Sequence, residues 1–544
     1  MRTIHTIITL LICSLCSAQI IQRNNSFKFK NSALVIEATI HSADSYRMDS
    51  RIYTDYHLQI RSLLKGSSST NEIILTDLGG TIGLERLEVS PSNSFQVGMH
   101  GIFFLNPIVD GSQYEVSFLG QSLVELNDVL SPDQLQEINE NYMAMDYLSI
   151  RFQEKSSTSS RVINNISPLN VVAGIGETIT ITGSGFGATG PNGAIKVWTP
   201  FANNPNSLIS HSQSYKYLSW SDTQIVFKVP SNAGTGQIRV GSSTNFASST
   251  QVLRITSNIK DQANALNTGI NSIHLPAKHL DGIQFVPQPN FTNVSAIDRF
   301  KEALEIWKCE SEIDFKYDEL STSSAAAGTN DGISVVGFDN ALGNSVLGVA
   351  LTSVSACSGN GRWFVADVDL LFNANINFNY SLNPTIAPQF DFYSVALHEL
   401  GHVRNHGHVL NTGYVMFPSI SSGVDRRILH PDEVAGAQIV QLDSSSNQVC
   451  NQPLMINATC STASTDDLAH LQISFYPNPV VDKVFFKNLD VLANTAYVLY
   501  DLNGKTIASE TRVDNSTLDV SRLSSGHYFI RFNESSQVFQ FVKQ

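Results

Sequence analysis

Short β-rich runs, separated by clusters of Gly, Ser and Asn, dominate the first part of the chain and predict strands joined by turns. One segment breaks this pattern, because SPDQLQEINENYMAMDYLSI carries the start signals of a helix at Ser131 and Pro132. We predict a mostly β domain over residues 19–160, which is either a pro-segment or an accessory barrel. The strand-like runs in it are ALVIEATI, YTDYHLQIRSLL, NEIILTDL and GIFFLNP.

Residues 161–256 follow a flexible serine-rich linker at Ser156–Ser160 and alternate apolar and polar residues between Gly turns. This pattern is typical of a small β-sandwich. The stretch resembles an IPT/TIG immunoglobulin-like domain over about Val162–Ile255, and such domains serve as spacers or binding modules. The residues that carry the resemblance are Ile166, Pro168, Gly174, ITITGSGFG (Ile179–Gly187), SDTQIVFKVP (Ser221–Pro230) and GTGQIRV (Gly234–Val240).

Residues 257–445 change character, since apolar residues recur at helical spacing in VSAIDRFKEALEIWKC, from Ile297 to Trp307. Four strand-like runs follow, and DFYSVALHELGHVRNHG is helical again. A closing helix, HPDEVAGAQIVQL, is predicted to begin near His430 or Pro431. The order helix, strands, helix, turn, helix indicates an α+β domain. The four strand-like runs are IDFKYDE, GISVVGF, VLGVALTSV and WFVADVDLLFN.

The last part of the chain returns to strand patterns. Residues 446–467 are polar and irregular and predict a linker, and residues 468–544 predict a compact β-sandwich. The tail resembles the C-terminal sorting domain of the type IX secretion system, which implies passage across an outer membrane and the secretion machinery as a partner. The matching pieces are Tyr476-Pro477-Asn478-Pro479, LYDLNGK (Leu499–Lys505), LDVSRLSSGHYFIRF (Leu518–Phe532) and the terminal VKQ.

The start of the chain predicts export. Arg2 supplies a short positive region, Ile7–Leu15 is a short apolar run, and small residues end at Ala18 before a predicted cut at Gln19. The run is far short of the ~20 residues needed to span a bilayer, and no later segment qualifies, so no transmembrane helix is expected. Together with the resemblance of the tail to a sorting domain, the signal over residues 1–18 implies a protein that is secreted by a Gram-negative bacterium or held on its surface.

Composition and net charge limit the classes of partner that the protein is expected to bind. The chain has 544 residues, too many for one core, and a formal net charge of −14. This charge argues against a nucleic-acid partner, which would need a basic face, and against docking by charge to anionic lipid. Four cysteines remain after the signal, and in an exported protein they predict disulfides. Proximity favours the pairs Cys309–Cys357 and Cys450–Cys460, although three connectivities are open.

The segment HELGHVRNHGH carries the chemistry. His398 and His402 are four residues apart, so on a helix they share a face and can reach one metal ion. Zinc accepts imidazole ligands, and a catalytic zinc site keeps one position open for water. Zinc would lower the pKa of that water to about 7, and Glu399 could then accept its proton as a general base.

A third ligand beyond the helix requires a sharp turn of the chain. Asn405 is suited to the positive φ that ends a helix, where Gly is the commonest residue and Asn its usual substitute. We therefore predict that the helix ends at Asn405 and that His408 folds back to the zinc. His406 follows the turn at the wrong offset and is expected to support the site or to be exposed, although it remains the alternative third ligand.

The same segment resembles the metzincin zinc-protease signature HExxHxxGxxH, with Asn405 in the place of Gly. Met416 in GYVMFP resembles the methionine turn, in the form seen in matrixins, and the resemblance covers about Phe291–Leu442. It implies that Met416 forms a packing floor beneath the zinc. It also implies a groove beside an edge strand, here VLGVALTSV, where a peptide substrate adds as a strand.

Other charged residues have weaker assignments. Asp367 and Asp369 alternate on a predicted strand, which is typical of a solvated face; the matrixin resemblance offers a calcium ion as the other interpretation. His274, His279 and His430 are expected to be surface histidines. Latency through a pro-segment cysteine is excluded, because no cysteine lies between Gln19 and Lys308.

These features predict a multidomain chain: an α+β metzincin-like catalytic domain over residues 257–445, an all-β N-terminal domain, an Ig-like β-sandwich and a C-terminal β-sandwich. The predicted function is a secreted zinc endopeptidase that hydrolyses proteins or peptides, with Glu399 as general base. One alternative is a surface adhesin with a vestigial protease domain, but such a domain would be expected to have lost Glu399 or a ligand. Another is a non-proteolytic zinc hydrolase, against which the methionine turn argues.

Overall fold

The computed structural model describes the chain in segments. It divides into two compact units, Met1–Ala458 and Thr459–Gln544. The predicted signal peptide, the helix predicted over residues 131–150 and the linker Ser156–Ser160 lie outside the described residues. The described residues are 21, 23–90, 95–108, 113–118, 121–126, 161–187, 194–198, 208–211, 217–231, 233–241, 246–263, 270–272, 282–343, 345–357, 362–458, 460, 474–476, 479–487, 497–501, 505–510, 517–532 and 538–544.

The N-terminal strands form a closed barrel. The sheet order is β1-β2-β3-β7-β6, and β1 pairs again with β6, while β8 extends β6. The segment is thus a barrel, and its role as a pro-segment or as an accessory domain stays a prediction. The elements are α1 (Asn25–Asn31), β1 (Leu34–Met48), β2 (Arg51–Lys65), β3 (Glu72–Leu78), β4 (Gly80–Ile82), β5 (Glu85–Ser90), β6 (His100–Pro107), β7 (Gln113–Val116) and β8 (Leu123–Glu125).

The next strands form a sandwich, as the alternating pattern predicts. Its two sheets have the orders β10-β17-β16-β12-β13 and β14-β15-β11-β9, and their inward residues form one apolar core. A two-stranded sheet, β18-β19, follows. The strands are β9 (Val162–Ser167), β10 (Asn170–Ala173), β11 (Thr178–Ser184), β12 (Ala194–Trp198), β13 (Leu208–His211), β14 (Tyr217–Trp220), β15 (Gln224–Lys228), β16 (Gly234–Gly241), β17 (Phe246–Asn258), β18 (Asp261–Ala263) and β19 (Ile270–Ser272).

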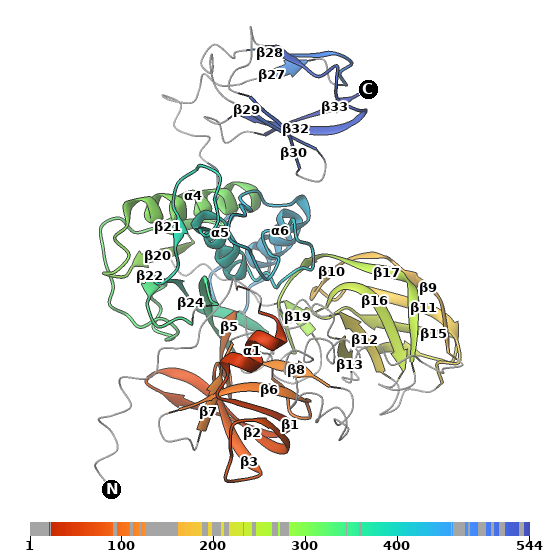
Figure 1. Cartoon of the computed structure of the whole chain (residues 1–544), viewed down its shortest axis with the longest axis vertical. Coiled ribbons are helices and arrows are strands. Elements are labelled where there is room, and N and C mark those ends of the chain that lie inside the picture. Colours follow the sequence, from red (N-terminus) through yellow and green to blue (C-terminus); the bar gives the residue numbers. More distant parts are fainter. Residues whose placement is uncertain are drawn as a thin grey trace. The chain divides into compact units, whose positions relative to one another are not determined.

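Residues 257–445 hold the helices and the four strands expected there, but a further strand over Ile283–Pro287 precedes the first helix (Figure 1). The sheet order is β21-β20-β22-β24-β23-β5-β4, so two strands of the N-terminal segment extend it. The elements are β20 (Ile283–Pro287), α4 (Val294–Ser311), β21 (Phe315–Tyr317), β22 (Val335–Asp339), β23 (Gly348–Ala356), β24 (Trp363–Asn373), β25 (Phe378–Asn379), β26 (Phe390–Asp391), α5 (Phe392–Val403) and α6 (Pro431–Ser446).

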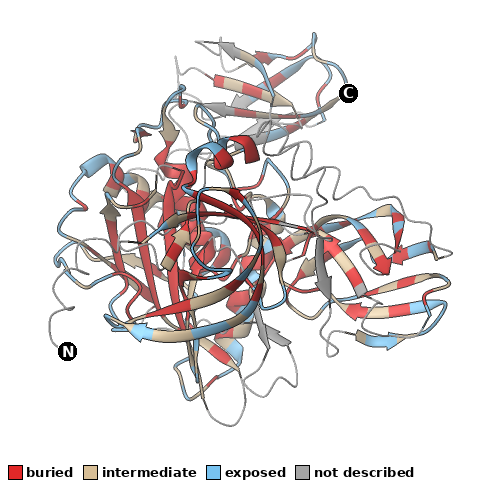
Figure 2. Cartoon of the chain, turned by 60° about the horizontal axis from the view of Figure 1, so that its bottom comes forward, coloured by how far each residue is buried: buried red, intermediate tan, exposed pale blue. Residues whose placement is uncertain are grey.

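This sheet has an apolar core on each face. Strands β21, β20, β22 and β24 are parallel, whereas β23 runs antiparallel to β24 and to β5. On one face, Ala350 and Val354 join the residues of α4 and α5 in one cluster. On the other face, Val349 and Leu351 join the barrel core. Buried residues accordingly run along the strands in Figure 2.

The C-terminal unit has its own core and two sheets, with the orders β27-β28-β31 and β30-β29-β32-β33. Part of the linker predicted over 446–467 belongs to the first unit, because Met455 is buried in the core of that unit. The strands are β27 (Ser474–Tyr476), β28 (Lys483–Lys487), β29 (Tyr497–Asp501), β30 (Thr506–Glu510), β31 (Thr517–Asp519), β32 (Gly526–Phe532) and β33 (Val538–Lys543).

The disulfide pairing favoured by proximity is wrong. Cys357 bonds to Cys450, 93 residues further along the chain, with 5.5 Å between their Cα atoms. Cys309 and Cys460 are also disulfide-bonded. Distance in the sequence failed as a guide because β23 ends beside the segment that follows α6. Among the described residues, no helix is long and apolar enough to cross a membrane.

Candidate metal centre

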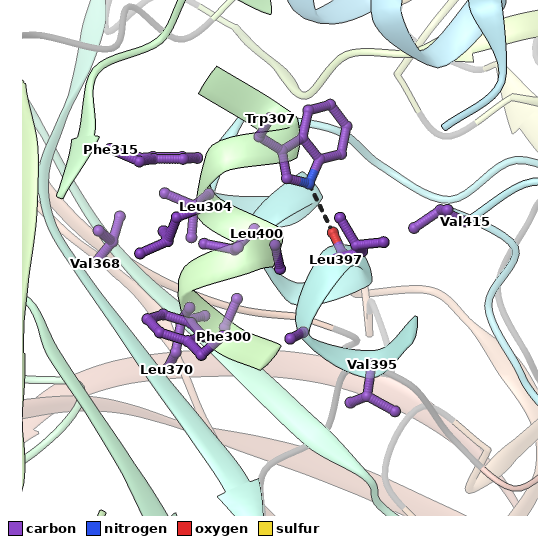
Figure 3. Packing of buried hydrophobic residues seen from close by; sticks show 14 of the residues in the cluster. Phe300, Leu304, Trp307, Phe315, Val368, Leu370, Val395, Leu397, Leu400 and Val415 are labelled. Atoms are coloured by element: carbon purple, nitrogen blue, oxygen red, sulfur yellow. Dashed lines mark hydrogen bonds between the residues drawn. The ribbon is translucent and has the colours of Figure 1, made fainter. Parts of the chain in front are cut away.

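Helix α5 carries the candidate residues through the core. Asp391 caps its first turn, since the carboxylate accepts the backbone N–H of Ser394 at 3.0 Å. Every residue of α5 is buried, so the helix is covered on all sides and not only on the face opposite the histidines. The indole Nε1 of Trp307 on α4 donates to the carbonyl of Leu397 at 2.9 Å (Figure 3). These contacts fix the rotation of α5.

The chain turns sharply after α5, as the sequence predicts. Asn405 has φ 64°, in the left-handed region, and its N–H donates to the carbonyl of His402 at 3.0 Å. The N–H of His406 then donates to the carbonyl of Gly401 at 2.9 Å. This turn brings His408 back to α5.

Three imidazoles converge on one point. The Nε2 of His398 lies 3.1 Å from the Nε2 of His402 and 3.3 Å from the Nε2 of His408. Zinc–nitrogen bonds of about 2.0–2.1 Å at tetrahedral angles place nitrogen ligands about 3.3 Å apart. All three side chains are buried. The structure therefore brings together the three residues predicted as ligands.

The protonation of these rings fits a metal ion. The Nδ1 of His398 lies 2.6 Å from the carbonyl of Val415, and that of His402 lies 2.8 Å from the carbonyl of His406. A carbonyl can only accept, so both Nδ1 atoms carry the proton and both Nε2 atoms present lone pairs. Burial lowers the pKa of His398 to about 4 and that of His402 well below its usual range, so both are neutral. Three imidazole nitrogens that turn their lone pairs to one point form a set of ligand atoms suited to a cation.

Glu399 is buried beside this cluster, on the side of β23. The expectation that VLGVALTSV is an edge strand is wrong, because β23 pairs with β5 as well as with β24. A Cβ added to Gly348, the first residue of β23, would lie 3.2 Å from Oε1 of Glu399. The glycine thus gives the carboxylate room between α5 and β23. The carboxylate points towards the strand, and its oxygens lie outside the cluster of ligand atoms that the three histidines form. A carboxylate in this position, next to the histidines, can accept or donate a proton.

The methionine turn packs beneath α5. Met416 is fully buried, and a Cβ on Gly401 would collide with its sulfur, so the glycine allows the side chain to contact the helix. Glu433 of α6 holds the turn, because its Oε1 accepts the N–H of Met416 at 2.7 Å. Burial raises the pKa of Glu433 to about 7. The sequence analysis missed Glu433, although its position three residues after His430 gives the signal of a capping box.

His406 lies outside the cluster. Its Nε2 is 3.0 Å from the carbonyl of Glu433, and its ring lies 5.4 Å from that of Trp307. The side chain is buried, so the expectation of an exposed residue is wrong, while its carbonyl supports His402. His430 caps α6 and stacks on Tyr414, so it has a structural role beyond that of a surface histidine. His274 and His279 lie outside the described residues.

The two aspartates of β24 do not form a solvated face, because both are buried. Asp367 Oδ2 accepts the N–H groups of Asp331 and Gly332 at 3.1 and 2.7 Å. Asp369 accepts those of Gly328 and Val335 at 2.8 and 2.9 Å. The carboxylates thus hold the loop before β22 against the sheet. Calcium binding by this pair stays a prediction.

Lys260 is a further charged group near the centre. It follows the sandwich domain, its N–H donates to the carbonyl of Asn405 at 2.8 Å, and its ammonium lies 3.7 Å from Glu88 of β5. Burial lowers the pKa of Lys260, and the carboxylate of Glu88 opposes that shift. No sequence signal links residues 88, 260 and 405, because only the fold brings them together.

Two parts of the chain match known domain families. Residues 162–255 match the IPT/TIG domain, and residues 474–544 match the secretion system C-terminal sorting domain. No curated protein matches the chain. Neither match overlaps residues 257–445, so the catalytic interpretation rests on the histidine cluster and its surroundings. The sorting domain indicates that the protein uses type IX secretion machinery and is secreted or held at the cell surface.

Proposed function

We propose that this chain is a secreted zinc-dependent endopeptidase of the metzincin type. The observation that carries the proposal is the convergence of three neutral imidazole nitrogens on one point, with Glu399 on the same helix. His398, His402 and His408 would hold the zinc ion. The left-handed turn at Asn405 and the buried Met416 add support, because the sequence predicts the turn and the metzincin resemblance implies the packing of Met416.

Zinc held there would supply Lewis acidity, which makes a water molecule acidic at neutral pH. Glu399 would act as the proton carrier, taking a proton from the attacking water and passing it to the nitrogen of the departing amine. The carbonyls of Val415 and His406 keep both ring protons on Nδ1, so that Nε2 stays available to the metal. An extended peptide beside Glu399 would pair with the backbone of β23 along the edge that β5 occupies here.

The proposal is tested by Glu399→Gln in the full chain. Glutamine keeps the shape of glutamate but does not accept the proton, and general acid–base catalysis contributes ~10²–10⁴-fold, so we expect turnover of a quenched fluorescent peptide to fall by at least that factor. Zinc content, measured by elemental analysis, should stay at the wild-type level. A zinc-containing variant that cleaves at the wild-type rate would rule out this mechanism.

A surface adhesin remains the second candidate, because the IPT/TIG match at 162–255 belongs to a family of binding and spacer domains. The two functions differ in their dependence on the histidine cluster. An adhesin would bind its target equally well after Glu399→Gln or zinc removal, and the wild-type protein would cleave no peptide under any condition.

A further inference from the structure

The edge of the sheet where a substrate would pair is covered by the protein's own chain. Without β4 and β5, β23 would be the last strand of the sheet. Instead β5 pairs with it in antiparallel fashion over six residues, from Ser355↔Glu85 to Ala350↔Ser90. A peptide that adds to a sheet edge uses the same backbone groups. A substrate strand and β5 therefore cannot occupy this edge of β23 together.

The register of the pairing places the end of β5 close to the proposed catalytic glutamate, Glu399. Ser90 lies opposite Ala350, and Gly348, which borders Glu399, comes two residues before Ala350 in β23. Alternate residues of a strand share a face. Gly348, Ala350 and Thr352 therefore share a face of β23, and it is the face on which α5 packs.

On the face of β5 that points towards α5, the negative charge of Glu88 is paired with the positive charge of Lys260. Glu88 lies opposite Thr352, and its carboxylate is 3.7 Å from the ammonium of Lys260. Both side chains are largely buried, with 9% and 16% of their surface exposed. A buried pair of opposite charges resists separation, because removing one partner leaves the other without compensation. This pair links β5 to the turn that positions His408.

The opposite face of β5 is anchored by apolar packing. Leu87 and Val89 lie opposite Ser353 and Leu351, and they belong to the core that joins the barrel to the central sheet. Only 3% and 8% of their surfaces are exposed. The strand is thus held by hydrogen bonds to β23, by the ion pair with Lys260 and by the barrel core.

We propose that β5 acts as an internal occupant of the substrate edge, so that the N-terminal barrel keeps the peptidase latent until β5 leaves β23. The proposal rests on the proposed peptidase function. Latency here acts through a strand that competes with substrate for the backbone of β23. The apparent affinity for a peptide is then the intrinsic affinity multiplied by the small fraction of molecules in which β5 is detached.

The test weakens the attachment of β5 by substitutions in β5 itself, while β23 and the three histidines keep their sequence. Val89→Thr places a hydroxyl in the apolar core, and Glu88→Gln removes the charge that pairs with Lys260. Val116→Thr is the matched control, because Val116 is buried in the same core on β7 and does not pair with β23. Each variant is made in the zinc-loaded full chain, once with Glu399 and once with Glu399→Gln.

Binding is measured in the Glu399→Gln background by fluorescence anisotropy, using a fluorescein-labelled hexapeptide with the sequence of residues 85–90. We expect Val89→Thr to raise its affinity about tenfold over the unmodified strand, since a buried unpaired hydroxyl costs about 1–3 kcal/mol. Glu88→Gln should act in the same direction, and Val116→Thr should match the unmodified protein. Equal affinity in all four proteins, or no binding to any of them, overturns the proposal.

Hydrolysis of a quenched fluorescent peptide by the proteins that retain Glu399 separates the two hypotheses. A rise with Val89→Thr, but not with Val116→Thr, supports both. Tighter binding without any hydrolysis would reject the peptidase function, while the hypothesis that β5 covers a peptide-binding edge would stand. Equal hydrolysis by the unmodified protein and Val89→Thr would reject latency while the peptidase function stands.

Discussion

At the residue scale, the four histidines of HELGHVRNHGH separate by the partners of their ring nitrogens. His398, His402 and His408 direct Nε2 to a shared point, whereas His406 directs Nε2 to the carbonyl of Glu433. A ring committed to a backbone carbonyl cannot also bind the metal through that nitrogen. This distinction leads to two predictions.

The first concerns the identity of the third ligand. His408→Ala should lose zinc, measured as metal per protein after dialysis, because two imidazoles remain where three converge. His406→Ala should keep one zinc per chain and lose stability, since it removes a buried ring beside Trp307. Zinc lost from His406→Ala and kept by His408→Ala would assign the third position to His406.

The second concerns pH. Burial lowers the pKa of His406 from 6.5 to about 4, so the unfolded chain binds more protons between these pH values. The stabilisation that neutral His406 provides is complete above about pH 6.5 and is lost as the pH falls towards about 4. His406→Gln keeps a donor for the carbonyl of Glu433 and does not titrate. Between about pH 7 and about pH 5, the free energy of unfolding in urea, with EDTA present, should therefore fall less for His406→Gln than for the wild type. Equal falls for the two proteins would contradict the lowered pKa of His406 in the folded state.

At the scale of elements, the candidate metal centre depends on the contact between α5 and the turn that carries Met416. Gly401 removes the side chain that would separate them, Met416 fills the space, and Glu433 of α6 holds the turn from the other side. Each of the three histidines lies on α5 or on the turn after it. The geometry of the ligands therefore depends on how closely α5 approaches the turn.

Gly401→Ala tests this dependence. The added methyl group would collide with the sulfur of Met416, and overpacking of a core costs about 1–3 kcal/mol. We expect a lower melting temperature and weaker zinc retention in competition with a chelator. Gly413→Ala is the control, because a Cβ there meets nothing nearer than the side-chain oxygen of Asn411 at 3.6 Å. If both variants retain zinc like the wild type, close packing at Gly401 is not needed.

At the scale of the whole molecule, the first unit joins the barrel, the sandwich and the central sheet, while the C-terminal unit has a separate core. The sorting-domain match assigns export to the second unit. Since the two cores share no residues, the export signal and the metal centre should be separable.

Deletion of Ser474–Gln544 tests this separation. The truncated protein should accumulate inside the outer membrane, because the sorting domain is gone, and its first unit should unfold with the wild-type melting temperature. Cys460 is retained, so the disulfide content of the protein does not change. Normal amounts of truncated protein outside the cell would show that export does not need the domain.

Local features of the fold and site were predictable from the sequence. The helix periodicity, the spacing of His398 and His402, and the tolerance of Asn for positive φ are properties of short segments. Contacts between distant segments were not. The pairing of β5 with β23, the ion pair of Glu88 with Lys260, and the disulfide between Cys357 and Cys450 join residues that only the tertiary fold brings together.

The Cys357–Cys450 bond has a consequence for how the chain responds to a backbone cut. It closes a covalent ring from the end of β23 to the segment after α6, and the proposed zinc ligands, Glu399 and Met416 all lie inside the ring. A single backbone nick anywhere within it leaves the two fragments tethered. In the chain-entropy view, a ring of this size also stabilises the fold by about 4–5 kcal/mol. The candidate metal centre can thus stay assembled after a cut that would release half of an uncrosslinked chain.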